Sequence, residues 1–139
     1  MNLILYNSNE ESFETLGIGV LSDFSTDPII TEVLKGEYIL EFDYIKNGKY
    51  CEYLLEQNII KALGQPFRIV SVNPSNSGYK VLAKHIYYDL KSNFLEDVAP
   101  TNKTAQEALK WILERTLFKN KFKVTGDCVE LASSRYVRT

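Results

Sequence analysis

The chain has 139 residues and a mass of 15.9 kDa, so one compact domain or two small ones is the upper limit. Hydrophobic residues make up 45% and charged residues 24%, as in ordinary globular proteins, which disfavours disorder, collagen and coiled coils. The net charge of −2 divides into −8 over residues 1–43 and +6 over residues 44–139, and nucleic acid is a poor partner because the acidic first third repels phosphate.

The N-terminus predicts neither a membrane span nor secretion. No run of about eighteen apolar residues occurs in the chain, as a spanning helix requires. The opening residues, MNLILYNSNEE, have no basic start and reach glutamate early, unlike a signal peptide. We therefore expect a protein that is not secreted by a signal peptide, with Cys51 and Cys128 as two free, buried thiols.

The first 90 residues predict strands, which the nine tyrosines and seven phenylalanines favour. Short apolar runs indicate strands over residues 3–6 and 17–22, and a loop passes through Asp27-Pro28. Residues 37–45 alternate most strongly, as in a half-buried antiparallel strand. One face of that strand holds Tyr38, Leu40, Phe42 and Tyr44, and the other holds Glu37, Glu41 and Asp43.

Turn chemistry predicts two hairpins. Asn47-Gly48 supplies the two residues with positive φ of a tight turn, with a returning strand over residues 50–55. Residues 58–63 fit either a strand or a short helical turn. A strand over residues 66–72, a loop over 73–78 and a strand over 79–87 form the second hairpin. Its first strand places Phe67, Ile69 and Ser71 opposite Arg68, Val70 and Val72.

The pattern changes after residue 90. Thr104-Ala-Gln-Glu107 is the sequence of a capping box, and the apolar spacing that follows predicts an amphipathic helix over residues 104–117. Short strands are predicted over residues 122–125 and 128–131. The fold class is therefore α+β, mainly β: a small antiparallel barrel-like domain over residues 1–92, followed by the start of an α+β domain over 93–139. Because residues 134–139 carry no stop signal, we expect a fragment of a longer protein.

Few residues suggest chemistry. His85, the single histidine, lies in a strand-like run and is predicted to be structural rather than a base or metal ligand. One histidine and two distant cysteines match no usual zinc site. Glu41 and Asp43 share a strand face, which is typical of any solvated strand and needs a cleft before it indicates catalysis.

Three further motifs have ordinary structural interpretations. Gly17-Ile18-Gly19 lacks the third glycine and the helix of a dinucleotide-binding loop. Asn102-Lys103-Thr104 has the form of a glycosylation sequon but fits a helix N-cap. Lys119, Lys121 and Lys123, beside Phe118 and Phe122, fit either an edge strand or a patch for an anionic partner. We therefore predict no catalytic, cofactor-binding or metal-binding residues and no cofactor.

Four segments resemble a known family. Residues 37–44 (EYILEFDY), 65–70 (QPFRIV), 83–90 (AKHIYYDL) and 104–109 (TAQEAL) are similar, in that order, to the N-terminal region of tail-tip hub proteins of long-tailed phages and prophages. These proteins are also described as minor structural proteins, tail-associated lysins or prophage endopeptidase tails.

The resemblance implies a structural role in the virion. Hubs of this family are trimers that close the distal end of the tail tube beneath a ring of distal tail protein, with the tape-measure protein as a further partner. Their barrel-like first domain is shared with contractile-tail baseplate hubs, and any receptor-binding or peptidoglycan-cleaving activity lies downstream. The resemblance therefore implies a hub module that is made in the bacterial cytoplasm, lies at the virion tail tip and is not itself an enzyme.

Two alternatives remain from the residues alone. The piece could belong to a cell-wall hydrolase whose catalytic domain lies downstream, or it could be a free-standing binding domain that uses its aromatic residues, for example for carbohydrate. The charge division is compatible with solvated faces of one domain or with complementary surfaces that meet between copies. We expect a trimer for the full-length hub and a monomer or weakly associating species for this fragment.

Overall fold

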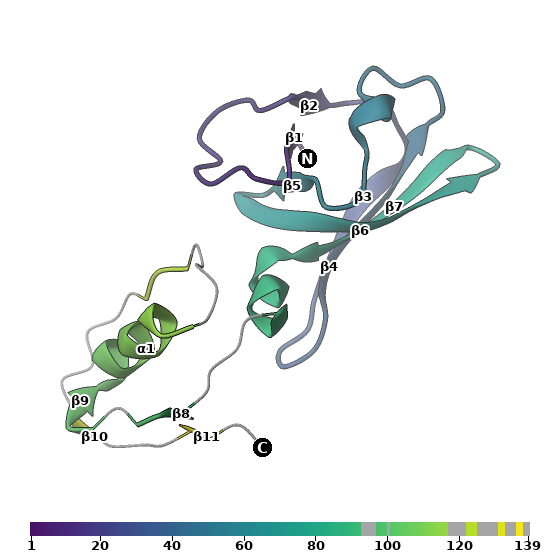
Figure 1. Cartoon of the computed structure of the whole chain (residues 1–139). Helices are drawn as coiled ribbons and strands as arrows, with labels where there is room; N and C mark the ends of the chain where they lie inside the picture. Colours follow the sequence, from purple (N-terminus) through teal and green to yellow (C-terminus); the bar gives the residue numbers. More distant parts are fainter. Residues whose placement is uncertain (93–96, 100, 117–121, 125–130, 133–135, 138–139) are drawn as a thin grey trace. The chain divides into compact units, whose positions relative to one another are not determined.

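The computed structural model describes residues 1–92, 97–99, 101–116, 122–124, 131–132 and 136–137 (Figure 1). The chain divides into two compact units, Met1–Tyr88 and Asp89–Thr139.

The first unit is a seven-stranded antiparallel sheet, which confirms a mainly-β fold. Its strands are β1 (Leu3–Tyr6), β2 (Gly19–Leu21), β3 (Phe24–Glu32), β4 (Tyr38–Ile45), β5 (Ile59–Ala62), β6 (Gln65–Ser75) and β7 (Gly78–His85). Their order across the sheet is β2-β1-β5-β6-β7-β4-β3. Two 3₁₀ helices accompany them, η1 (Cys51–Tyr53) and η2 (Ile86–Ser92).

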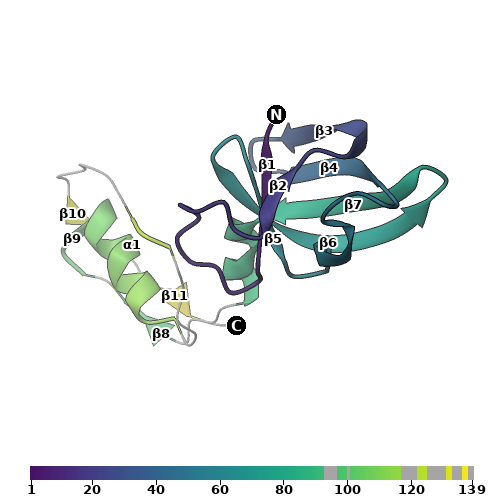
Figure 2. The same ribbon diagram turned by 90° about the horizontal axis from the view of Figure 1, so that it is seen from above.

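The sheet curls around one apolar core. Only Ser22 and Asp23 separate the two edge strands, β2 and β3, so opposite edges of the sheet meet at this corner. In Figure 2, β3, β4, β7 and β6 fan out beside one another, while β1, β2 and β5 gather at one end. The core contains Leu3, Leu5, Leu21, Leu40, Phe42, Tyr44, Leu54, Ile60, Ala62, Phe67, Ile69, Val81 and Ala83. Removal of these side chains from water is the main driving force for the curled shape.

The loop predicted through Asp27-Pro28 is wrong, because β3 continues through both residues. Pro28 lies on an edge strand, where its missing N–H need not remove a ladder hydrogen bond. Thr26 pairs with Asp43 and Ile29 with Glu41, which leaves Asp27 and Pro28 together opposite a single residue of β4. This is a β-bulge, and it accommodates the extra residue within the strand.

The hairpin predicted at Asn47-Gly48 is also wrong. Neither residue has a positive φ, and η1 replaces the expected returning strand. β4 is already paired with β3 on one side and β7 on the other, so no edge is left for a further strand. Gly48 serves close packing instead, since a Cβ there would overlap the ring of Tyr44.

The ambiguous segment over residues 58–63 contains strand β5. Leu63 and Gly64 connect it to β6 with φ values of 48° and 78°, while Ala62 pairs with Gln65. Two residues with positive φ between paired strands are typical of a type I′ hairpin turn.

The second predicted hairpin is confirmed, with a tighter turn. β6 runs to Ser75 and β7 begins at Gly78, so only residues 76–77 form the turn. The predicted faces of β6 hold through Ile69 and are wrong beyond it. Because Ile69 pairs with Ala83 and Ser71 with Leu82, Val70 is an extra, bulged residue, and Val72 packs against the core.

The second unit contains the predicted helix. Helix α1 (Ala105–Glu114) begins after Thr104, whose Oγ1 accepts a hydrogen bond from the Glu107 N–H at 3.2 Å, while the Thr104 N–H donates to Glu107 Oε2 at 3.0 Å. The capping box is therefore confirmed. The helix is shorter than predicted, and residue 117 lies outside the described residues.

Four short strands complete this unit. β9 (Lys103–Thr104) pairs with β10 (Leu131–Ala132), and β8 (Asp97–Val98) pairs with β11 (Tyr136–Val137). Of the two strands predicted here, residues 122–124 are not in a strand and residue 125 lies outside the described residues. Residues 128–130 of the other also lie outside them, and its last residue belongs to β10.

Candidate functional site

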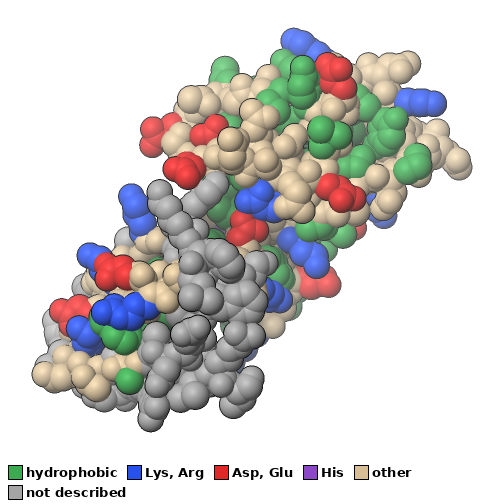
Figure 3. Space-filling view, viewed as in Figure 1, with side chains coloured by type: hydrophobic (Ala, Val, Ile, Leu, Met, Phe, Trp, Pro, Cys, Tyr) green, Lys and Arg blue, Asp and Glu red, His purple; other side chains and the backbone are tan. Residues whose placement is uncertain are grey.

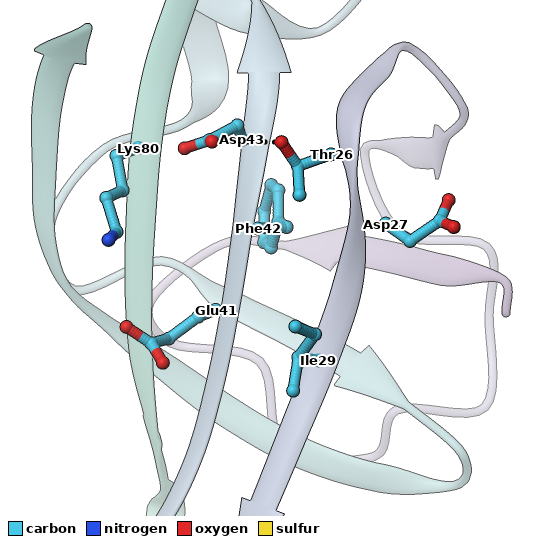
Figure 4. Close-up of a pocket in the computed structure, with 7 residues that line it drawn as sticks. All are labelled: Thr26, Asp27, Ile29, Glu41, Phe42, Asp43 and Lys80. Carbon is cyan, nitrogen blue, oxygen red and sulfur yellow. Dashed lines mark hydrogen bonds between the residues drawn. The ribbon is translucent and has the colours of Figure 1, made fainter.

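A pocket lies on the outer face of the first unit, where β3, β4 and β7 run side by side (Figure 4). Its volume is about 140 Å³, and it is lined by Thr26, Asp27, Ile29, Glu41, Phe42, Asp43 and Lys80. The β3 bulge forms one wall. In Figure 4, Thr26 and Asp43 point toward each other, whereas the Asp27 carboxylate points away from them.

The polar groups of this β3–β4 pocket are incompletely paired. The Thr26 hydroxyl donates to Asp43 Oδ2 at 3.1 Å, but Asp43 Oδ1 is buried and accepts no hydrogen bond. Lys80 lies opposite Asp43 in the register of β4 and β7 and is itself exposed. A shielded oxygen without a donor is unfavourable, and with Glu41 and Asp27 it gives the pocket an acidic lining. Among the described residues, no group of three His, Cys, Asp or Glu side chains could hold a metal ion.

His85 lies at the end of β7, as predicted, and has structural partners. Its Nε2 and Gln65 Oε1 are 3.0 Å apart, and Nδ1 accepts the Tyr87 N–H at 3.1 Å. The imidazole stacks on Tyr38 with ring centroids 4.6 Å apart, and Phe67 meets it edge-on at 5.5 Å. Burial lowers the pKa of His85, partly opposed by the charge of Glu32.

We expect His85 to make the stability of the first unit depend on pH. Its pKa is lower in the folded chain than the ordinary value of 6.5, so the unfolded chain binds more protons between the two pKa values. The free energy of unfolding should therefore fall as the pH drops below about 6.5. H85Q, which cannot titrate but can still bond to Gln65, should lose less stability between about pH 7 and about pH 5. Urea unfolding of both proteins measures this, and equal losses would contradict it.

Tyrosines near His85 form a cluster that the sequence analysis missed. The Tyr87 and Tyr88 rings stack with centroids 4.3 Å apart, and both hydroxyls donate to the Gly36 carbonyl, at 3.4 and 3.2 Å. The hydrogen bond with Tyr88 raises the pKa of Tyr87 to about 12, and burial and the charge of the Tyr88 phenolate add to this effect. These two hydrogen bonds to Gly36 connect the β3–β4 turn to η2. In the sequence, the adjacent Tyr87-Tyr88 pair was the one feature that could have indicated this cluster.

The remaining sequence candidates have structural places. Cys51 is free but half-buried rather than buried, and burial raises its thiol pKa, which disfavours the reactive thiolate. Cys128 lies outside the described residues. Gly17-Ile18-Gly19 leads into β2 rather than a helix, and the Ile18 N–H donates to the Leu5 carbonyl at 2.8 Å.

The two motifs in the second unit are only partly described. Thr104 of the sequon is the helix N-cap. Lys123 is exposed, whereas Lys119 and Lys121 lie outside the described residues, so the edge-strand and anionic-patch interpretations both stay predictions. No helix in the described part of the chain is both long and apolar enough to cross a membrane.

Comparison with known families shows to which protein family the chain belongs. Residues 3–89 match the family model described as Prophage endopeptidase tail N-terminal domain. The chain belongs to this family. The match begins with β1 and ends within η2, so the family domain of this prophage tail protein coincides closely with the curled sheet of the first unit. No curated protein and no solved structure matches the chain.

Proposed function

We propose that this prophage tail protein is a structural module of the tail-tip hub. The module closes the distal end of the tail tube and joins it to downstream receptor-binding or cell-wall-degrading domains. The family match over residues 3–89 carries the proposal, because it covers the folded sheet rather than a short motif. In the virion, the module lies at the tail tip.

Hydrogen bonds of the first unit support a structural role. Tyr6 donates to the Thr15 carbonyl at 2.5 Å, and the Lys49 N–H donates to Asp23 Oδ2 at 2.7 Å. Tyr87 and Tyr88 bind the carbonyl in the β3–β4 turn. The Tyr6 bond is half-buried and ties a loop to β1. The other bonds are exposed, and they connect segments outside the strands to one another.

The proposed assembly is a homotrimer of the full-length hub, with distal tail protein and tape-measure protein as its neighbours. The division of charge into −8 over residues 1–43 and +6 over residues 44–139 fits a heterologous contact, in which one patch meets a different patch on the next copy. Charges at the rim of such a contact are screened within about 8–10 Å at moderate salt. In dilute solution the chain alone should therefore be a monomer or associate weakly, and trimeric contacts should form as its concentration rises.

A second candidate is a cell-wall hydrolase with its catalytic domain downstream of this chain. The word endopeptidase in the family description favours it. A peptidoglycan-release assay on the full-length protein separates the two roles, since only the hydrolase should be active. We expect no activity from residues 1–139 alone under either candidate. Activity in this chain would assign catalysis to the module itself.

Labelling of intact particles tests the proposed location. An epitope inserted between Asn76 and Ser77, the exposed two-residue turn between β6 and β7, leaves the strand pairing unchanged. Antibody-gold on induced prophage particles should mark the distal tip of the tail. Label along the tail shaft, on the capsid or only on cell debris would refute the proposal.

A further inference from the structure

The sheet leaves one long edge open. β3 pairs with β4 on one side, and no described strand pairs with its other side. Beyond the bulge, residues 29–32 pair regularly with β4, so the backbone there keeps the geometry that an added strand requires. Edges of this kind are usually protected by lysine, proline or a bulge. Here the proline and the bulge protect only the part before Ile29.

Exposed apolar side chains continue along this edge into its turn. The exposed fractions are 58% for Ile29, 54% for Val33 and 92% for Leu34. On the face drawn in Figure 3, hydrophobic side chains of the first unit are exposed among acidic and basic ones. We call residues 29–34 the β3 edge. Apolar surface at an open strand edge is typical of an interaction site.

Charge argues against pairing of two β3 edges with each other. β3 carries Asp27 and Glu32, both exposed, and no basic residue. Two antiparallel copies of β3 would bring these carboxylates from both chains to one seam, where like charges destabilise the pair. The edge is therefore suited to a different, basic surface.

The β3–β4 pocket beside this edge is suited to the same kind of partner. Glu41 and Asp43 supply carboxylates, and Asp43 Oδ1 has no donor. Ile29 belongs both to the β3 edge and to the pocket lining. A lysine or arginine side chain from a segment laid along the edge would meet the negative charge of these carboxylates, and pairing with Glu41 would be a charge-assisted hydrogen bond.

We propose that the β3 edge and the β3–β4 pocket form one side of the contact between neighbouring copies of this chain. The other side is a lysine- or arginine-bearing segment from residues 44–139 of the next copy, the part of the chain with a net charge of +6. The contact is heterologous and can close into a ring. The inference rests on the proposed hub assembly and names the surface that forms it.

Sedimentation of the chain over a rising concentration series, at low and at high salt, tests this contact. The wild type should associate weakly toward a trimer, and salt should weaken the association. I29K removes exposed apolar area and adds a charge at the edge, and D43N removes the Asp43 carboxylate from the pocket while keeping the shape of the side chain. Each should raise the dissociation constant about tenfold, equivalent to about 1.4 kcal/mol. E41Q is a second pocket variant with the same expected direction.

Matched controls change similar residues elsewhere. L16K alters a residue that is 67% exposed, and E14Q removes an exposed carboxylate, both in the loop between β1 and β2 and outside residues 44–139. Each control should leave the dissociation constant within about twofold, and circular dichroism verifies the fold of every variant. A chain that is monomeric at every concentration, a stable dimer, or edge variants that behave like the controls would overturn the contact. Antibody labelling of the tail tip tests the hub proposal separately, so the failure of this contact would not by itself contradict the hub proposal.

Discussion

G78A is expected to destabilise the first unit by about 3–5 kcal/mol, the combined scale of a strained backbone and an overpacked core. Gly78 begins β7 with φ of 145°, a conformation that residues with side chains rarely adopt. A Cβ there would overlap the Tyr44 carbonyl oxygen and lie 2.9 Å from the Lys46 backbone nitrogen. β4 and β7 can therefore pair at this end only if residue 78 has no side chain.

Gly64 provides the matched control. Its φ is also positive, at 78°, but a Cβ would meet nothing within 4 Å. G64A should cost only the conformational strain, about 1–2 kcal/mol. Urea unfolding followed by circular dichroism measures both variants. Equal losses would show that the close approach of β4 and β7 is not what requires glycine.

F67A is expected to destabilise the same unit by about 3–5 kcal/mol. Phe67 is fully buried in the core, and its ring meets Tyr38 edge-on at a centroid distance of 5.2 Å. Its loss leaves a cavity and removes the contact that supports His85. Unfolding in urea gives the free energy, and proton shifts of the His85 ring report the loss of the aromatic neighbour.

V70A is the control for this substitution. Val70 is the bulged residue of β6 and is 38% exposed, so its truncation should cost less than about 1 kcal/mol. If V70A proved as costly as F67A, the position of the bulge, and with it the assignment of β6 residues to the core, would be wrong.

Alternation and the helix-capping motif predicted the parts of the fold that depend on neighbouring residues. The faces of β4 followed from its period of two, because Leu40, Phe42 and Tyr44 are all buried. The capping box at Thr104 followed from four consecutive residues. Both features need only the local chain, and both were predicted correctly.

Features that depend on strand order were not predicted. The sequence Asp27-Pro28 reads as a loop, and only the edge position of β3 makes a strand possible there. Asn47-Gly48 reads as a hairpin, but β4 has both its edges occupied.

The candidate site was missed for the same reason. Glu41 and Asp43 were identified as one strand face, yet the pocket also needs residues from β3 and β7. No local pattern predicts that Thr26 and Lys80 lie on either side of Asp43, because this depends on register between distant segments.

A cryo-electron microscopy reconstruction of the prophage tail tip tests the central proposal most directly. If this chain is a hub module, density at the distal end of the tail tube should accommodate three copies of the curled sheet of Met1–Tyr88, related by a three-fold axis along the tube. The β3 edge of each copy should face its neighbour. A tip without this domain, or the domain found only elsewhere in the particle, would contradict the proposal.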